Sequence, residues 1–208
     1  MRFADLDAVT LDAFGTLVTL ADPVPTLVGS LRERGVEVPR ERVAEAFAGE
    51  GDFYRERSLE GRNEESLARL RAECTGVFLE AAGVDLEPAG FVDSYIRALR
   101  FELVPGVAGA VAGLRRRGLA LAVVSNWDMA LPDHLAELGL EDLPVTTSAA
   151  ARAAKPDPAP FQMALETLGV RPERALHIGD SEADELGAKA VGMHFAWAPV
   201  AAAIEGIT

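Results

Sequence analysis

The sequence contains a single cysteine and no long apolar run, and both absences limit what the protein can be. Cys74 alone cannot form an intramolecular disulfide, which is compatible with the reducing cytosol. No apolar run approaches the roughly 20 residues that a membrane-spanning helix needs. The first residues also lack the apolar stretch of a signal peptide. We therefore expect a cytoplasmic protein with no membrane partner.

Positive charge is scarce as well. The chain has 20 lysine and arginine residues against 33 aspartate and glutamate residues, which gives a formal net charge of −13. Such a charge argues against a nucleic acid partner, because nucleic acid phosphates are themselves negative. A small phosphorylated metabolite remains open as a ligand, since one metal ion and one lysine can reverse the local field.

The apolar pattern divides the 208 residues into an inserted helical block and an alternating region. Residues 21–101 have helical spacing and predict four helices, with Asn63 capping the third and Gly83 ending it. After Pro105 the chain alternates between helices and short apolar strands, which predicts an α/β fold with a doubly wound parallel sheet. The strands expected in this sheet are 6–11, 119–124, 144–147, 175–178 and 193–197, with a loop of small residues at 149–154.

The segment Leu11-Asp12-Ala13-Phe14-Gly15-Thr16-Leu17 places an aspartate at the end of the first expected strand. Open α/β sheets bind ligands at the carboxyl ends of their strands, so this carboxylate is expected at the mouth of the sheet. Gly15 permits a sharp turn there. An isolated aspartate in such a turn is usually a cap, but polar residues at three later strand ends favour a catalytic role.

Two of these later strand ends carry amide, hydroxyl and ammonium groups. Ser125 and Asn126 follow the second expected strand, where they can either bind an oxyanion or cap the next helix. Lys155 follows the third strand and is one of two lysines in the chain. The proline after Lys155 restricts its backbone, which favours a directed side chain over a solvated loop lysine.

The fourth strand is followed by two aspartates, Asp180 and Asp184. They lie one helical turn apart at the start of an expected helix, so both can face the same crevice. Together with Asp12 they would crowd like charges that only a cation or protons relieve. The three histidines lack the spacing of metal ligands and are expected to be structural or surface residues: His134, His177 and His194.

The ordered set Asp12-x-Phe14-Gly15-Thr16-Leu17, Ser125-Asn126, Lys155-Pro156 and Gly179-Asp180-x-x-x-Asp184 resembles the haloacid dehalogenase (HAD) superfamily of hydrolases. The resemblance covers the first expected strand and the whole alternating region. It implies that residues 1–17 and 103–208 form a Rossmann-like α/β core. Residues 18–102 match the helical cap of that family in place and size.

The resemblance also implies a role for each matching residue. Asp12 would be the catalytic nucleophile, and Lys155 would steady negative charge during catalysis. The residues implied in phosphate binding are Thr16, Ser125, Asn126 and Lys155. The residues implied in binding Mg²⁺ are Asp12, Phe14 through its backbone carbonyl, Asp180 and, in support, Asp184.

Phe14 departs from the pattern of most phosphatases in the superfamily, which carry an aspartate there to protonate the leaving group. General acid catalysis is worth about 10²–10⁴-fold in rate, and phenylalanine cannot supply it. An aromatic residue at this position resembles the 2-haloacid dehalogenases of the same superfamily, which expel halide without an acid. If another residue replaces the missing acid, Glu182 or a side chain of the cap is the candidate.

The pair Gly179-Asp180, by contrast, resembles the magnesium motif of the phosphatases. A dehalogenase gains nothing from a further carboxylate, because like charges raise the pKa of its nucleophile. A phosphatase needs that carboxylate for its metal. We therefore expect a Mg²⁺-dependent phosphatase that acts on a small phosphorylated metabolite through an aspartyl-phosphate. The alternatives are a 2-haloacid dehalogenase-like hydrolase and a phospho-ligand-binding protein with low turnover.

Overall fold

The computed structural model describes residues 2–207, which divide into two compact units. One unit runs up to Thr19 and resumes at Glu102, and the other is Leu20–Phe101. We call them the sheet unit and the helical unit and describe each by itself. The chain passes from one to the other through two short strands, β2 (Val18–Leu20) and β3 (Phe101–Leu103), which form a two-stranded sheet.

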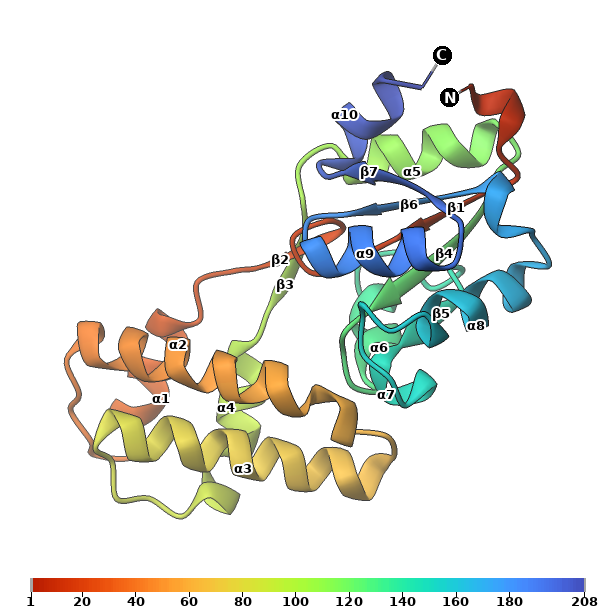
Figure 1. The fold of residues 1–208 in the computed structure, drawn as a ribbon. Helices are drawn as coiled ribbons and strands as arrows, with labels where there is room; N and C mark the ends of the chain where they lie inside the picture. Colours follow the sequence, from red (N-terminus) through yellow and green to blue (C-terminus); the bar gives the residue numbers. More distant parts are fainter. Residues whose placement is uncertain (1, 208) are drawn as a thin grey trace. The chain divides into compact units, whose positions relative to one another are not determined.

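The sheet unit is built on five strands in the order β5-β4-β1-β6-β7 (Figure 1). Their bounds are β1 Ala8–Leu11, β4 Ala120–Ser125, β5 Val145–Thr147, β6 Ala175–Gly179 and β7 His194–Trp197. Each neighbouring pair is parallel, and β1 lies between β4 and β6. All of β1 is buried, as expected of a strand covered on both faces. The carboxyl ends of β1, β4 and β6 therefore meet where α/β sheets bind ligands.

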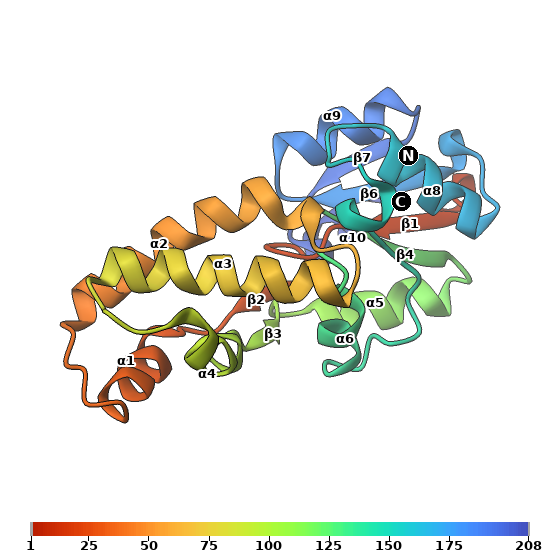
Figure 2. The ribbon, with the colours of Figure 1, turned by 90° about the horizontal axis from the view of Figure 1, so that it is seen from below.

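Helices cover both faces of this sheet, so the predicted doubly wound α/β fold is confirmed. The bounds are α5 Val107–Arg116, α6 Leu131–Ala136, α7 Ser148–Ala151, α8 Ala159–Leu168, α9 Glu182–Ala190 and α10 Val200–Glu205. Buried side chains of α8 and α9 share one core cluster with residues of β1, β4 and β6. α5 lies on the opposite face (Figure 2) and contacts α10.

The structure differs from the sequence prediction at short elements. The predicted loop 149–154 begins with the one-turn helix α7, because the Thr147 side chain accepts a hydrogen bond from the backbone N–H of Ala150 at 3.1 Å and caps the turn. The strands β2 and β3 and the helix α10 were not predicted. Three-residue strands are too short to show a period of two, and the first five residues of α10 are all apolar, so they reveal no face.

The helical unit packs four helices around a core of its own. Their bounds are α1 Val24–Arg32, α2 Arg40–Arg57, α3 Glu64–Ala82 and α4 Val92–Ala98. As predicted, Asn63 caps the start of α3, its side chain accepting from the backbone N–H of Ser66 at 2.9 Å, and Gly83 with φ of 71° caps the end. The ring of Phe78 lies at the centre of this core, 5.1 Å from the Tyr95 ring. None of the helices that the structure describes is long and apolar enough to cross a membrane.

Candidate active site

Asp12 lies directly after β1, at the edge of the sheet where β4 and β6 also end. Its backbone N–H donates to the carbonyl of Ile178 at 2.9 Å, which extends the pairing of β1 with β6 by one residue. The residue is only 5% exposed. A carboxylate this buried needs hydrogen bonds or opposite charges as partners. The ends of the neighbouring strands and loops supply them.

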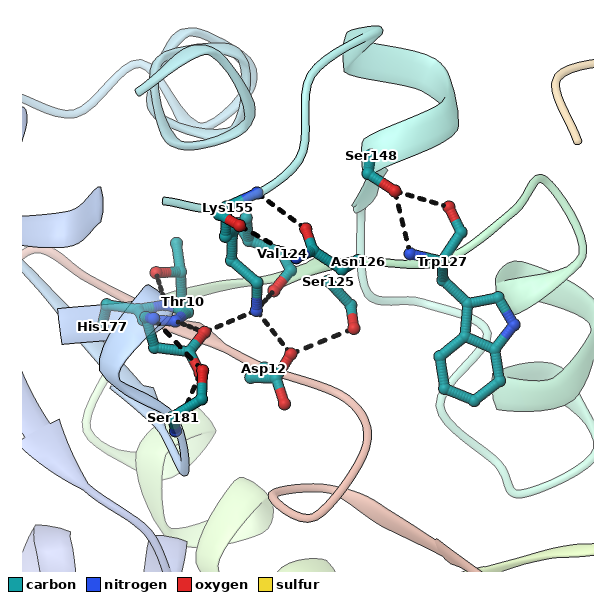
Figure 3. Close-up of polar contacts among 11 residues, drawn as sticks. Thr10, Asp12, Val124, Ser125, Asn126, Trp127, Ser148, Lys155, His177 and Ser181 are labelled. Carbon is teal, nitrogen blue, oxygen red and sulfur yellow. Dashed lines mark hydrogen bonds and ion pairs between the residues drawn. The ribbon is translucent and has the colours of Figure 1, made fainter. Parts of the chain in front are cut away.

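Two donors meet one oxygen of Asp12 (Figure 3). Ser125, the last residue of β4, donates from Oγ to Asp12 Oδ1 at 3.0 Å, and Lys155 donates from Nζ to the same oxygen at 2.6 Å. No hydrogen bond from the described residues reaches Oδ2. The structure thus brings three of the predicted site residues together, and it holds the carboxylate by one oxygen while the other remains available.

The ammonium of Lys155 is fully hydrogen-bonded. Its three hydrogens serve Asp12 Oδ1 at 2.6 Å, Asp184 Oδ1 at 2.5 Å and the carbonyl of Val124 at 2.9 Å. Burial disfavours the charged form, but the charges of Asp12 and Asp184 outweigh it and raise the pKa of Lys155 above its ordinary value. Lys155 is therefore a buried, charged bridge between two carboxylates.

Asn126 and Thr16 differ in whether their side chains have hydrogen-bond partners. The Asn126 amide donates from Nδ2 to the carbonyl of Lys155 at 3.1 Å and accepts at Oδ1 from the Lys155 backbone N–H at 2.7 Å. It holds the lysine segment in place, because an amide beside an irregular loop pairs with the backbone of that loop. The hydroxyl of Thr16 is buried and has no hydrogen-bond partner among the described residues. Phosphate binding by either side chain stays a prediction.

Asp180 follows β6 and lies against the turn after Asp12. Gly15 in that turn has φ of +82°, and a Cβ added there would lie 2.0 Å from Asp180 Oδ2. Only glycine therefore permits this approach of the two segments. Burial, and then the negative charges of Asp12 and Asp184, raise the pKa of Asp180 above its usual range. The site holds more negative charge than its own groups neutralise.

Asp184 lies in the first turn of α9 and is 1% exposed. Its Oδ1 accepts from Lys155 Nζ at 2.5 Å and from His177 Nε2 at 3.0 Å. Its Oδ2 accepts from the backbone N–H of Ser181 at 3.1 Å and from the Ser181 hydroxyl at 2.5 Å. Burial alone would raise the pKa of Asp184, but the His177 hydrogen bond and the Lys155 charge lower it well below its usual range. Asp184 is therefore an anion with both oxygens engaged.

His177 and Thr10 belong to this site although the sequence pattern missed them. Both lie within buried strands, and His177 Nδ1 is 2.8 Å from Thr10 Oγ1. Burial lowers the pKa of His177 despite the opposing effect of Asp184. The sequence analysis tested the histidines only for the spacing of metal ligands, and His177 does not have that spacing. A polar residue inside an apolar strand must find a partner in the core, and that rule would have pointed to both residues.

The carboxylates of Asp12, Asp180 and Asp184 form a cluster suited to a divalent cation. One oxygen from each lies within 4.8 Å of the others. Three carboxylates and one ammonium leave two uncompensated negative charges, and Mg²⁺ prefers carboxylate oxygens as ligands. The carbonyl of Phe14 accepts no hydrogen bond from the described residues and can add a neutral oxygen. Asp12 and Asp180 can thus hold the ion, whereas Asp184 is already fully hydrogen-bonded.

A family model of haloacid dehalogenase-like hydrolases matches residues 6–192. The chain belongs to this family. The resemblance read from the ordered motifs is thereby confirmed, and with it the hydrolase class.

The relatives of this HAD hydrolase include phosphatases and dehalogenases. It is 46% identical over 97 residues to haloacid dehalogenase-like hydrolase domain-containing protein 3 of Bos taurus, covering 45% of this chain and 39% of that protein. It is 29% identical over 196 residues to a phosphoglycolate phosphatase of Cereibacter sphaeroides, covering 92% of this chain and 84% of that one. The chain spans about two fifths of the length of the first of these relatives.

A solved structure adds a dehalogenase to this comparison. The L-2-haloacid dehalogenase from Xanthobacter autotrophicus, with chloropropionic acid covalently bound, matches with a TM-score of 0.67 and 26% identity, covering 91% of this chain and 76% of that one. Both activities therefore occur among the relatives. Membership of the family establishes a hydrolase, and the bond that is cleaved has to be argued from the site.

Proposed function

We propose that this HAD hydrolase is a Mg²⁺-dependent phosphatase that acts on a small phosphorylated metabolite through an aspartyl-phosphate on Asp12. The observation that supports this most is the excess of negative charge, since three carboxylates lie together and the one ammonium beside them pairs with Asp12 and Asp184. Asp180 adds a carboxylate for which a dehalogenase has no use. A bound Mg²⁺ ion would offset the charges of nucleophile and phosphate and polarise the phosphoryl group. The helical unit is the proposed cap, which sets substrate choice.

Asp12 supplies the nucleophile in this proposal. A carboxylate oxygen of Asp12 forms a bond to phosphorus while the bond from phosphorus to the leaving oxygen breaks, and the leaving group departs with that electron pair. Water then attacks the aspartyl-phosphate, releases inorganic phosphate and restores the carboxylate. Ser125 and Lys155 both donate to Asp12 Oδ1 and so orient the carboxylate for the first step. The charge of Lys155 also stabilises the developing negative charge.

Phe14 limits which phosphates react. The residue is 50% exposed, and its ring lies 6.3 Å from the ring of Trp127 and carries no transferable proton. The leaving oxygen then departs as an anion unless another residue protonates it. Phosphates of acidic leaving groups, such as phenols and carboxylic acids, are therefore the favoured substrates.

Phe14 also supports a second candidate, a 2-haloacid dehalogenase-like hydrolase. In that reaction Asp12 attacks the carbon that bears the halogen, and halide leaves with the electron pair of the broken bond. Halide needs no proton, so the missing acid would be no disadvantage. Chloride release from 2-chloropropionate without metal identifies this activity. Binding of a phosphorylated ligand without any phosphoenzyme identifies the third candidate, a binding protein with low turnover.

The variant Asp12→Asn tests the nucleophile. An amide is a far weaker nucleophile than a carboxylate, so we expect turnover to be abolished while the circular dichroism spectrum stays that of the wild type. Asp7→Asn is the matched control, because Asp7 pairs with Arg174 at 2.6 Å outside the site. This control should keep full activity. More than a few per cent of wild-type activity in a clean Asp12→Asn preparation would exclude Asp12 as the nucleophile.

A further inference from the structure

A continuous row of hydrogen-bonded side chains runs from the core of the sheet to Asp12 (Figure 3). Thr10 Oγ1 lies 2.8 Å from His177 Nδ1, and His177 Nε2 lies 3.0 Å from Asp184 Oδ1. Lys155 Nζ donates to the same Asp184 oxygen at 2.5 Å and to Asp12 at 2.6 Å. All five residues are at most 6% exposed. The whole row is therefore buried.

The hydrogen-bond partners of His177 determine which of its ring nitrogens carries a hydrogen. A carboxylate only accepts hydrogen bonds, so His177 Nε2 carries a hydrogen and donates it to Asp184. Thr10 holds the ring at its other nitrogen. Phe161 of α8 packs against the ring at 5.0 Å in an edge-on arrangement, and Phe195 lies 6.3 Å away. The ring is thus fixed in one orientation, with Nε2 aimed at Asp184.

We propose that His177 is a positioning residue for the hydrolytic reaction. By donating to Asp184 it holds that carboxylate where it shares the Lys155 ammonium with Asp12. The inference rests on the proposed role of Asp12 as nucleophile. It explains a buried polar group that neither metal binding nor phosphate contact uses.

Loss of His177 is expected to weaken the hydrogen bond between Lys155 and the nucleophile Asp12. Asp184 Oδ1 would keep one donor instead of two, and an under-bonded buried carboxylate is costly. Lys155, the donor that Oδ1 would retain, would be drawn toward Asp184 and away from Asp12. The nucleophile would then lose its shortest hydrogen bond and its orientation. Residues that orient a catalytic group in this way typically contribute about 10–100-fold to activity.

The composition of the chain makes this row observable by NMR. It contains two lysines, Lys155 and Lys189, and three histidines, so selective ¹⁵N labelling of each residue type gives few signals. Lys189 pairs with Glu185 at 2.5 Å on the surface and serves as an internal reference. We expect a hydrogen on His177 Nε2 and a slowly exchanging Nζ signal for Lys155. A wild-type His177 without a hydrogen on Nε2 would overturn the proposal.

Two substitutions of His177 separate positioning from packing. His177→Leu removes the donor, whereas His177→Gln retains an N–H group close to the place of Nε2. We expect His177→Leu to shift the Lys155 Nζ signal and lower kcat on p-nitrophenyl phosphate by about 10–100-fold with little change in KM. His177→Gln should recover most of this loss. Thr10→Val, which frees the far side of the ring, should give a smaller loss in the same direction.

Leu165→Val is the matched control, since Leu165 belongs to the same buried core cluster and its side chain forms no hydrogen bond. It should lower Tm and leave both kcat and the Lys155 signal unchanged. A Lys155 signal and kcat unaffected by His177→Leu would contradict the proposal, and so would equal losses in His177→Leu and His177→Gln. If the wild type hydrolyses no phosphate, the proposed function fails. The NMR comparison needs no turnover and still decides whether His177 positions Lys155.

Discussion

Phe14 stands where most phosphatases of the family carry a proton donor, so the leaving group decides the rate. A general acid contributes about 10²–10⁴-fold, or roughly 2.7–5.4 kcal/mol of barrier. Nitrophenolate leaves readily without a proton, whereas an alkoxide does not. We expect wild-type rates to fall steeply as leaving-group pKa rises across aryl and alkyl phosphates. A flat plot, with chemistry rate-limiting, would mean that another residue such as Glu182 donates the proton.

The variant Phe14→Asp restores a carboxyl group at this position. We expect it to accelerate alkyl phosphates more than aryl phosphates, by up to about 10²–10⁴-fold, and so to flatten the dependence on leaving-group pKa. Phe14→Asn is the matched control, because it has the same size and no acidic proton. Equal behaviour of the two variants in steady-state assays would contradict the assignment of Phe14 as a missing acid.

Helices and strands were predicted correctly where neighbouring residues in the sequence determine them. The strand before Asp12 and the Asn63 cap of α3 follow from neighbours a few residues away. The pairing of β2 with β3 does not, because it joins three-residue segments about eighty positions apart. The same holds for Asn126, which meets the Lys155 backbone only after β4 and a distant loop are brought together. Such contacts depend on tertiary structure, which no local pattern records.

Glu50 is a buried carboxyl group in the helical unit. It lies on α2 and accepts a hydrogen bond from the Tyr95 hydroxyl at 2.5 Å. Burial raises the pKa of Glu50 despite that hydrogen bond. The folded protein therefore keeps this proton at a pH where the unfolded chain has lost it. The resulting stability is fully present below the unfolded pKa of about 4.3 and is lost as the pH rises through the folded pKa.

The variant Glu50→Gln should avoid this loss, since an amide can accept from Tyr95 and stays neutral. We expect its Tm at pH 8 to exceed that of the wild type by about 2–4 °C, the change that roughly 1 kcal/mol produces in a chain of this size. The difference should disappear near pH 4.5. Glu45→Gln, an exposed change on the same helix, serves as control in calorimetry. A wild type more stable than Glu50→Gln at pH 8 would contradict the burial argument.

For the whole molecule, the family, the α/β sheet and the inserted helices were all readable from the order of motifs along the chain. The carboxylate cluster was also readable, because the ends of parallel strands must converge. The sequence did not show which of these carboxylates are free to bind a metal, because that depends on which carboxylate oxygens accept hydrogen bonds from Lys155, His177 and Ser181. Asp180 emerges as the carboxylate whose loss should affect metal binding most.

Mg²⁺ should stabilise the folded chain by mass action. An ion at about 100 times its Kd adds roughly 2.7 kcal/mol to the free energy of unfolding. We expect a corresponding rise in Tm for the wild type and loss of most of that rise in Asp180→Ala. Asp85→Ala, at an exposed position in the helical unit, should keep it. An equal shift in Asp180→Ala and the wild type would remove Asp180 from the metal site.

The most direct test of the central claim is a paired assay on one preparation, with Mg²⁺ and again with excess EDTA. It measures phosphate released from p-nitrophenyl phosphate and chloride released from 2-chloropropionate, with Asp12→Asn as the blank. We predict phosphate release that requires Mg²⁺ and no chloride release under either condition. Chloride release that persists in EDTA, or phosphate release unchanged by removal of the metal, would contradict a Mg²⁺-dependent phosphatase.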